Sequence, residues 1–124
     1  RARLAERAGA RYLSRPERAD VVIEATGAPD AAFAAIASLA PLGVCALLGA
    51  GAGRGEIRFL DLVVGNQVVF GSVNASPGSF ARAAEDLARF DAALLRAMIR
   101  RTSRALDAIL HPPPDAVKMV VEVN

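Results

Sequence analysis

The sequence is poor in the residues that mark metal sites and disulfide-bonded proteins. It has no tryptophan, one histidine and one cysteine among 124 residues. The single cysteine, Cys45, excludes an internal disulfide and favours a reducing, cytoplasmic location. His111 stands in a proline-rich turn where we expect it to be exposed and without a catalytic role. Because no metal-ligand spacing surrounds either residue, we predict no metal ligands in this chain.

Long apolar runs and an excess of one charge are absent as well. No stretch reaches the roughly 18 apolar residues of a transmembrane helix, and there is no signal peptide, so we expect no membrane partner. Fifteen Lys and Arg against 13 Asp and Glu leave a net charge of +2. Because the arginines are scattered along the chain, we also expect no nucleic-acid partner.

An initiator methionine is missing too. Residue 1 is Arg, and RARLAERAGA has the pattern of a helix already under way, closed by Gly9. We therefore expect a fragment of a longer protein. Apolar residues make up 53% of the chain, which is enough for one domain with a core.

The first half of the chain has the pattern of a βαβ unit. DVVIEAT, residues 20–26, is a continuous apolar run typical of a strand buried in a parallel sheet. Residues 28–43 have a helical pattern, with Asp30 as the expected N-cap and the Pro-Leu-Gly of 41–43 as the end. VCALLG, residues 44–49, is the next buried strand. This alternation predicts an α/β fold with a parallel sheet.

The remaining elements are predicted from shorter patterns. We expect a helix beginning at Pro77, with Ser76 as its cap, because proline is favoured at the first helical position. The other expected elements are a strand over 11–13, a loop with one helical turn over 56–66, a strand over 67–74, short helices over 93–101 and 103–110, a turn over 111–115 and a closing strand over 117–123.

The stretch LLGAGAGRGE, residues 47–56, invites comparison with a pyrophosphate-binding turn. In a G-x-G-x-x-G pattern starting at Gly49 or Gly51, the third glycine falls on Arg54 or Glu56. No long amphipathic helix follows to place its positive end on a phosphate. We therefore predict no phosphate loop here. Two alternatives stay open, a flexible loop after a strand and a backbone that approaches a flat ligand closely.

Several polar residues follow the expected strands, where ligands bind in open α/β sheets. Asn74 is suited to a sugar hydroxyl or a carboxamide, although the residues alone favour a turn asparagine followed by a helix cap at Ser76. Thr26 and Gly27 stand at the tip of the first strand. Glu24 lies inside that strand, and we expect it near a sheet edge or beside a basic residue. No nucleophile–base pair stands out, so we assign no catalytic residue.

Three segments carry a resemblance to a known family: DVVIEATGAPDAAFAAIASLAPLGVCALLGAG, NQVVFGSVNASPGSFARAAEDLARF and PPDAVKMVVEV. In their order they resemble the C-terminal half of glucose 1-dehydrogenases, in the zinc-dependent medium-chain alcohol dehydrogenase superfamily. The resemblance implies the second half of a Rossmann-type doubly wound parallel sheet, followed by a C-terminal helical tail and a closing strand. It implies a partial dinucleotide-binding domain over 1–75 and, over 76–124, a tail that packs on a catalytic domain.

The resemblance also implies the activity and its residues. The full enzyme would oxidise a small-molecule sugar substrate, D-glucose or a related aldose, at C1 to the lactone with NADP or NAD, and its zinc would have no ligands in this chain. Asn74 would also bind the sugar. The residues implied to bind the cofactor are Leu48, Gly49, Ala50, Ser72, Val73, Asn74, Thr26 and Gly27.

Two other hypotheses remain at this point. The chain could be a non-catalytic, truncated α/β module that acts by association, or part of another polyol or alcohol dehydrogenase. A half sheet exposes a strand edge that can pair with another chain, and we expect a homo-oligomer.

Overall fold

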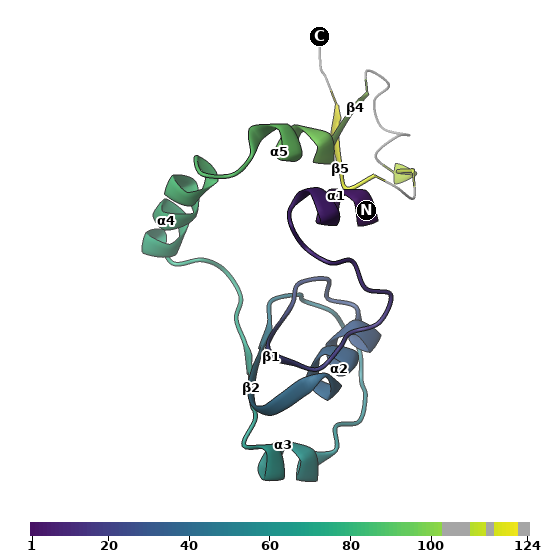
Figure 1. Ribbon diagram of the computed structural model, residues 1–124, viewed down its shortest axis with the longest axis vertical. Helices are drawn as coiled ribbons and strands as arrows, with labels where there is room; N and C mark the ends of the chain where they lie inside the picture. Colours follow the sequence, from purple (N-terminus) through teal and green to yellow (C-terminus); the bar gives the residue numbers. More distant parts are fainter. Residues whose placement is uncertain (103–109, 114–115, 122–124) are drawn as a thin grey trace. The chain divides into compact units, whose positions relative to one another are not determined.

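The computed structural model describes residues 1–102, 110–113 and 116–121. The chain forms two compact units. One is Leu13–Ser76, and the other combines Arg1–Tyr12 with Pro77–Asn124. Figure 1 labels most of the helices and strands of the two units.

The unit Leu13–Ser76 is built on a three-stranded parallel sheet with the order β1-β2-β3. Its elements are β1 (Ala19–Glu24), α2 (Pro29–Ala37), β2 (Leu39–Leu47), α3 (Phe59–Gly65) and β3 (Val68–Gly71). At the carboxyl ends of the strands, Glu24 is paired with Leu47, which is paired with Gly71. The loops that follow the three strands therefore begin at the same edge of the sheet, and the predicted βαβ unit is confirmed.

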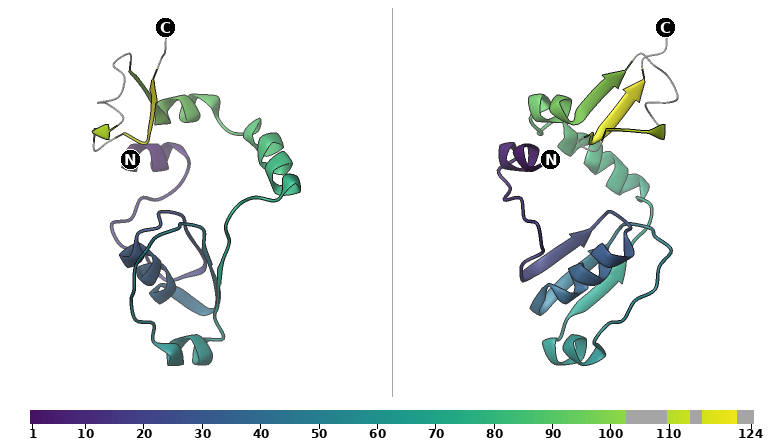
Figure 2. Two further views of the ribbon diagram at one scale, coloured as in Figure 1. Left: turned by 180° about the vertical axis from the view of Figure 1, so that it is seen from behind. Right: turned by 90° about the vertical axis from the view of Figure 1, so that its right-hand side faces the viewer.

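One face of this sheet carries the core. In Figure 2, α2 lies alongside the strands on this face. Successive side chains of a strand point to opposite faces of the sheet, so every second side chain points toward the helices and the others point away from them. The buried apolar cluster is Ala35, Ile36, Leu39 and Cys45, with Val22, Leu47, Leu62 and Val69 packed against it. The residues of the opposite parity, among them Val21, Ile23, Val68 and Phe70, are exposed.

The helix predicted over 28–43 is shorter than expected. It ends at Ala37, where the Ser38 hydroxyl donates to the Ala35 carbonyl at 2.7 Å. Its N-cap is Ala28, not Asp30, because Pro29 occupies the first helical position. The expected helix end at 41–43 is also wrong. These residues lie in β2, in a bulge where the register against β1 shifts, and proline is tolerated at such a bulge.

The strand predicted over 11–13 is not formed. The preceding helix, α1 (Ala2–Arg7), does end as predicted, with Gly9 at φ +75°. The Gly9 N–H donates to the Glu6 carbonyl and the Ala10 N–H to the Ala5 carbonyl, each near 3.0 Å. This is the hydrogen-bond pattern of a glycine-terminated helix.

The second unit contains α1 and the elements that follow residue 76. These are α4 (Pro77–Leu87), α5 (Ala92–Met98), β4 (Ile99–Thr102) and β5 (Lys118–Val121). Helix α4 begins at Pro77 as predicted, and β5 confirms the closing strand. The helix predicted over 93–101 stops at Met98 because the next residues form β4, which pairs in parallel with β5.

The prediction of a helix over 103–110 lies almost entirely outside the described residues. His111 is exposed, as expected. Within the described ranges, no helix has both the length and the apolar character needed to cross a membrane.

Candidate functional site

The three segments predicted to bind the cofactor lie next to one another at the carboxyl edge of the sheet. Leu48 N–H and Gly49 N–H donate to the Glu24 carbonyl at 2.7 and 3.2 Å. Ser72 N–H donates to the Leu47 carbonyl at 3.0 Å. These bonds extend the ladders beyond the strands. Residues 26–27, 48–50 and 72–74 therefore follow β1, β2 and β3 as three adjacent loops.

Glu24 organises the first of these loops. Its side chain is only 5% exposed. One carboxylate oxygen, Oε1, accepts hydrogen bonds from the Thr26 N–H at 2.6 Å, the Thr26 hydroxyl at 2.5 Å and the Gly27 N–H at 3.1 Å. Of the two expected surroundings of Glu24, the sheet edge agrees with β1 as an outer strand, and the basic partner is wrong: in the described part of the chain, the partners of this carboxylate are backbone and hydroxyl donors.

These hydrogen bonds favour the charged form of Glu24. The Thr26 hydroxyl, followed by the Thr26 N–H, lowers the pKa of Glu24 below its ordinary value of 4.5. Burial opposes this, and the Gly27 N–H adds to the lowering. A carboxylate that accepts several N–H and O–H bonds is stabilised in its charged form. Glu24 is thus ionised at neutral pH.

Thr26 continues the hydrogen-bond chain into helix α2. Its hydroxyl donates to Glu24 and accepts from the Ala28 N–H at 3.1 Å. Ala28 is the N-cap residue of α2. The hydroxyl therefore links the end of β1 to the start of α2, which is a structural task in addition to any contact with a ligand.

The glycine-rich stretch packs against the β1–α2 connection of the same chain. A Cβ at Gly49 would overlap the Gly27 nitrogen, and one at Gly51 would overlap the Gly27 carbonyl oxygen. Further on, a Cβ at Gly53 would overlap Pro29, and one at Gly55 would overlap Phe33. The backbone thus makes the close approach considered from the sequence, but to another segment of this chain. No helix starts on these glycines, since α3 begins only at Phe59.

The wall formed by the second and third loops has an apolar and a polar part. Leu48 is 47% exposed and Val73 is 76% exposed. Asn74 is exposed and has a left-handed backbone with φ +64°, a conformation that asparagine tolerates better than most residues. No hydrogen bond among the described residues engages its amide. Apolar side chains beside an available amide fit the face and the carboxamide of a nicotinamide.

The described residues do not fit a zinc ion. They contain no group of three or more His, Cys, Asp or Glu side chains that could hold a metal. Cys45 is fully buried in the core. Burial, followed by the negative charge of Glu24, raises the pKa of the Cys45 thiol. The raised pKa disfavours the thiolate, which is the form that binds zinc.

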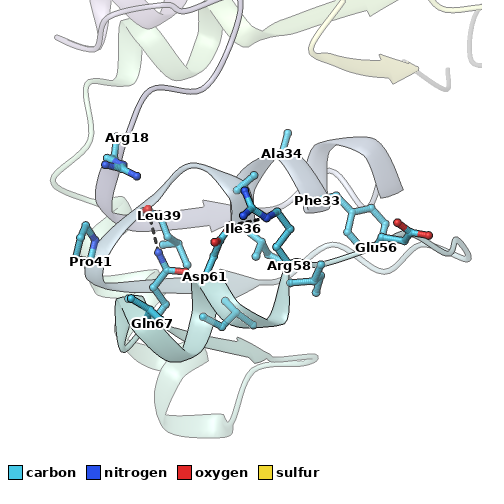
Figure 3. Close-up of a pocket in the computed structure, with 15 residues that line it drawn as sticks. Arg18, Phe33, Ala34, Ile36, Leu39, Pro41, Glu56, Arg58, Asp61 and Gln67 are labelled. Atoms are coloured by element: carbon cyan, nitrogen blue, oxygen red, sulfur yellow. Dashed lines mark hydrogen bonds and ion pairs between the residues drawn. The ribbon is translucent and has the colours of Figure 1, made fainter.

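A separate cavity of about 740 Å³ lies between α2, α3 and the start of β2 (Figure 3). None of the predicted site residues lines it. The Gln67 amide donates to the carbonyls of Leu39 and Ala40, and Arg58 pairs with Asp61 at 3.5 Å. Gln67 and the Arg58–Asp61 pair are thus already engaged within the fold. Because ligands of open α/β sheets bind outside the carboxyl ends of the strands, we do not assign this cavity to the cofactor.

Sequence reasoning did not find the hydrogen bonds of Glu24 or the role of Gln67. The signal for Glu24 was present in the order Glu-Ala-Thr-Gly, where an acid ends an apolar strand and a turn follows. Gln67 offered no signal, because its partners are carbonyls far away in the sequence.

Comparison with known proteins agrees with the resemblance. The family model described as glucose dehydrogenase C-terminus matches residues 4–123. The glucose 1-dehydrogenase of Thermoproteus tenax is 43% identical over 93 residues, which cover 67% of this chain and 27% of that protein. Glucose 1-dehydrogenase 1 of Caldivirga maquilingensis is 36% identical over 117 residues, which cover 85% of this chain and 33% of that protein. The chain therefore spans about a quarter to a third of these relatives.

Solved structures share the fold. Haloferax mediterranei glucose dehydrogenase, solved with NADP, Zn and gluconolactone, has a TM-score of 0.74 at 22% identity, covering 97% of this chain and 39% of that one. Bacillus subtilis 2R,3R-butanediol dehydrogenase has a TM-score of 0.66 at 22% identity, covering 99% of this chain and 35% of that one. The predicted fold, a part of a Rossmann-type parallel sheet, is confirmed. The chain belongs to the glucose dehydrogenase C-terminus family.

Proposed function

We propose that the chain is the C-terminal part of an NAD(P)-dependent glucose 1-dehydrogenase, which oxidises D-glucose at C1 to the lactone. The observation that carries the proposal is the convergence of residues 26–27, 48–50 and 72–74 at the carboxyl edge of one parallel sheet. That edge is where cofactors bind in this class of fold. The names of the relatives supply the substrate.

The loops have different tasks in this proposal. Leu48 and Val73 offer apolar side chains to the nicotinamide ring, and the loop 48–50 presents backbone beside them. Ser72 and Asn74 offer hydrogen bonds, with the Asn74 amide shared between the carboxamide and a sugar hydroxyl. Thr26 and Gly27 line the cleft on the other side of residues 48–50. When bound, the nicotinamide supplies the hydride acceptor for the oxidation.

The rest of the machinery is proposed to lie elsewhere in the protein. The pyrophosphate turn, the zinc ligands and the proton relay come from outside this chain, consistent with the share of each relative that it spans. Within the chain, residues 1–75 are proposed to belong to the dinucleotide-binding domain, including α1 although it groups with the second compact unit, and 76–124 are proposed to pack on the catalytic domain. The protein is proposed to be a cytoplasmic homo-oligomer. Strands β1 and β3 are the outer strands of the sheet in this chain, and an outer strand that the rest of the protein leaves unpaired can pair with another copy.

The test is an assay of the full-length protein that contains this chain. Purified and supplied with zinc, it should reduce NADP+ or NAD+ in the presence of D-glucose and release the lactone. A panel of aldoses, polyols and secondary alcohols identifies the preferred substrate, and a clear preference for a polyol would replace the glucose assignment. A folded protein that binds neither NAD+ nor NADP+ would instead support the non-catalytic module.

A further inference from the structure

We propose that Glu24 is a positioning residue that fixes two loops of the cofactor wall, 26–27 and 48–50, relative to each other. The inference rests on the proposed function, because it assigns Glu24 a part in placing the nicotinamide. Glu24 does not belong to the predicted binding residues. It acts through the loops that carry them.

Glu24 is hydrogen-bonded to both loops. Its carboxylate accepts from the Thr26 N–H, the Thr26 hydroxyl and the Gly27 N–H. Its backbone carbonyl accepts from Leu48 N–H and Gly49 N–H. A shift of this one residue therefore moves the β1–α2 turn and the loop after β2 together.

The two loops also touch each other across the carboxylate. A Cβ at Gly49 would lie 2.8 Å from Glu24 Oε2 and would overlap the Gly27 nitrogen. Gly27 itself has φ +71°, and a Cβ on it would lie 2.8 Å from the Ala50 carbonyl oxygen. The atoms nearest to these positions are thus the Glu24 carboxylate and backbone atoms of the facing loop.

The negative charge of the Glu24 carboxylate strengthens this arrangement. A buried carboxylate is unfavourable unless hydrogen-bond donors surround it. Here the donors converge mainly on one oxygen, and hydrogen bonds to a charged acceptor are about twice as strong as neutral ones. Glutamine has the same shape but gives up the charge, and its amide nitrogen cannot accept from Gly27. The negative charge therefore tightens the turn, and the turn holds Gly27 against the loop 48–50.

The experiment uses the full-length enzyme with Glu24→Gln, Thr26→Val and Thr26→Ser. Thr26→Val removes the hydroxyl donor, and Thr26→Ser restores it. Ile36→Val is the matched control. Ile36 is 6% exposed in the core of this unit and belongs to neither loop, so its truncation weakens the fold without changing the bonds of Glu24. Thermal unfolding measures the stability of the four variants, so that kcat is compared between variants with a similar loss of stability.

Two readouts distinguish positioning from general weakening. In the enzyme without cofactor, amide hydrogen exchange should accelerate at residues 26–28 and also at 48–49 in Glu24→Gln. With cofactor, kcat should fall at least about tenfold while the Kd for NADP+ stays within about twofold, because a misplaced reacting group costs rate more than binding. Thr26→Val should move in the same direction, Thr26→Ser should return toward wild type, and Ile36→Val should keep its kcat.

The inference is overturned if Glu24→Gln and Thr26→Val lose no more kcat than Ile36→Val at equal stability. Faster exchange confined to residues 26–28 would overturn it as well. Failure of the proposed function is a different result, in which the wild-type enzyme binds no nicotinamide cofactor or oxidises no aldose. Should Glu24→Gln not fold, the Thr26 pair still decides through hydrogen exchange at residues 48–49 in the enzyme without cofactor, which a direct contact of Thr26 with the cofactor does not affect.

Discussion

Gly51 lies against Gly27 so closely that a Cβ at Gly51 would overlap the Gly27 carbonyl oxygen. The atom in the way is backbone, so relief requires one of the two loops to move. We predict that Gly51→Ala lowers the free energy of unfolding by about 1–3 kcal/mol, the usual cost of forcing extra atoms into a packed site. Denaturant unfolding of the variant beside wild type measures the difference.

Gly71→Ala is the matched control for that prediction. Gly71 ends β3 at the same edge of the sheet, but a Cβ there would have nothing within 4 Å. Its substitution should change the free energy of unfolding by no more than about 0.5 kcal/mol. Equal losses in the two variants would mean that the packing of Gly51 on Gly27 is not what requires glycine.

Asn74 combines a strained backbone with an amide assigned to ligand binding, and two substitutions separate these roles. Asn74→Ala keeps the left-handed φ of +64° unfavourable and removes the amide, whereas Asn74→Gly removes the amide and relieves the backbone. We predict that both variants lose at least about tenfold in glucose turnover, the value of roughly one hydrogen bond. Only Asn74→Ala should also lose stability.

Steady-state kinetics and thermal unfolding of the two Asn74 variants check this. If Asn74→Gly keeps wild-type turnover, the amide has no part in the reaction and Asn74 is a turn residue. Such a result would leave Ser72 and Val73 as the contacts of the third loop.

The sequence was sufficient for the parts of the fold that depend on short-range pattern. The apolar runs at 20–26 and 44–49 identified neighbouring parallel strands, and Gly9 and Pro77 marked helix ends correctly. The errors arose where tertiary packing competed with local preference. Leu39 continues the helical apolar pattern, yet it belongs to β2. The chain turns at Ser38, and Leu39 is 1% exposed in the core that β2 forms with α2.

The candidate site could be predicted only in part. The strand-end principle selected Thr26, Gly27 and Asn74, and the resemblance added residues 48–50; the three segments do lie at one edge of the sheet. The reason for the glycines was not accessible, since it depends on the contact between residues 49–55 and the β1–α2 connection. The bonds that satisfy Glu24 had a signal in the order Glu-Ala-Thr-Gly, but an acid in a strand also suggests a sheet edge or a basic partner, and the donors here are backbone N–H groups and a hydroxyl.

The loss of folding stability at acidic pH should depend on Glu24. Its pKa is lowered in the folded protein, first by the Thr26 hydroxyl, so between that value and 4.5 the unfolded chain binds more protons than the folded one. The stability that this carboxylate contributes is complete above pH 4.5 and is lost as the pH falls through the lowered pKa. Melting temperatures from pH 7 to pH 3 should fall less steeply for Glu24→Gln than for wild type. Parallel curves would show that the hydrogen bonds of Glu24 do not favour its charged form.

Cys45 should be inert toward thiol reagents in the native protein. It is fully buried, and burial together with the charge of Glu24 raises its pKa, while alkylation requires an accessible thiolate. We predict no modification of Cys45 by iodoacetamide at pH 8 in the native state and complete modification in denaturant, followed by mass spectrometry of the peptide that contains it. In Glu24→Gln the loss of the neighbouring charge should leave this protection in place, because burial is the larger cause. Rapid native labelling would mean that the sheet opens at β2, the strand on which the core and the candidate site both depend.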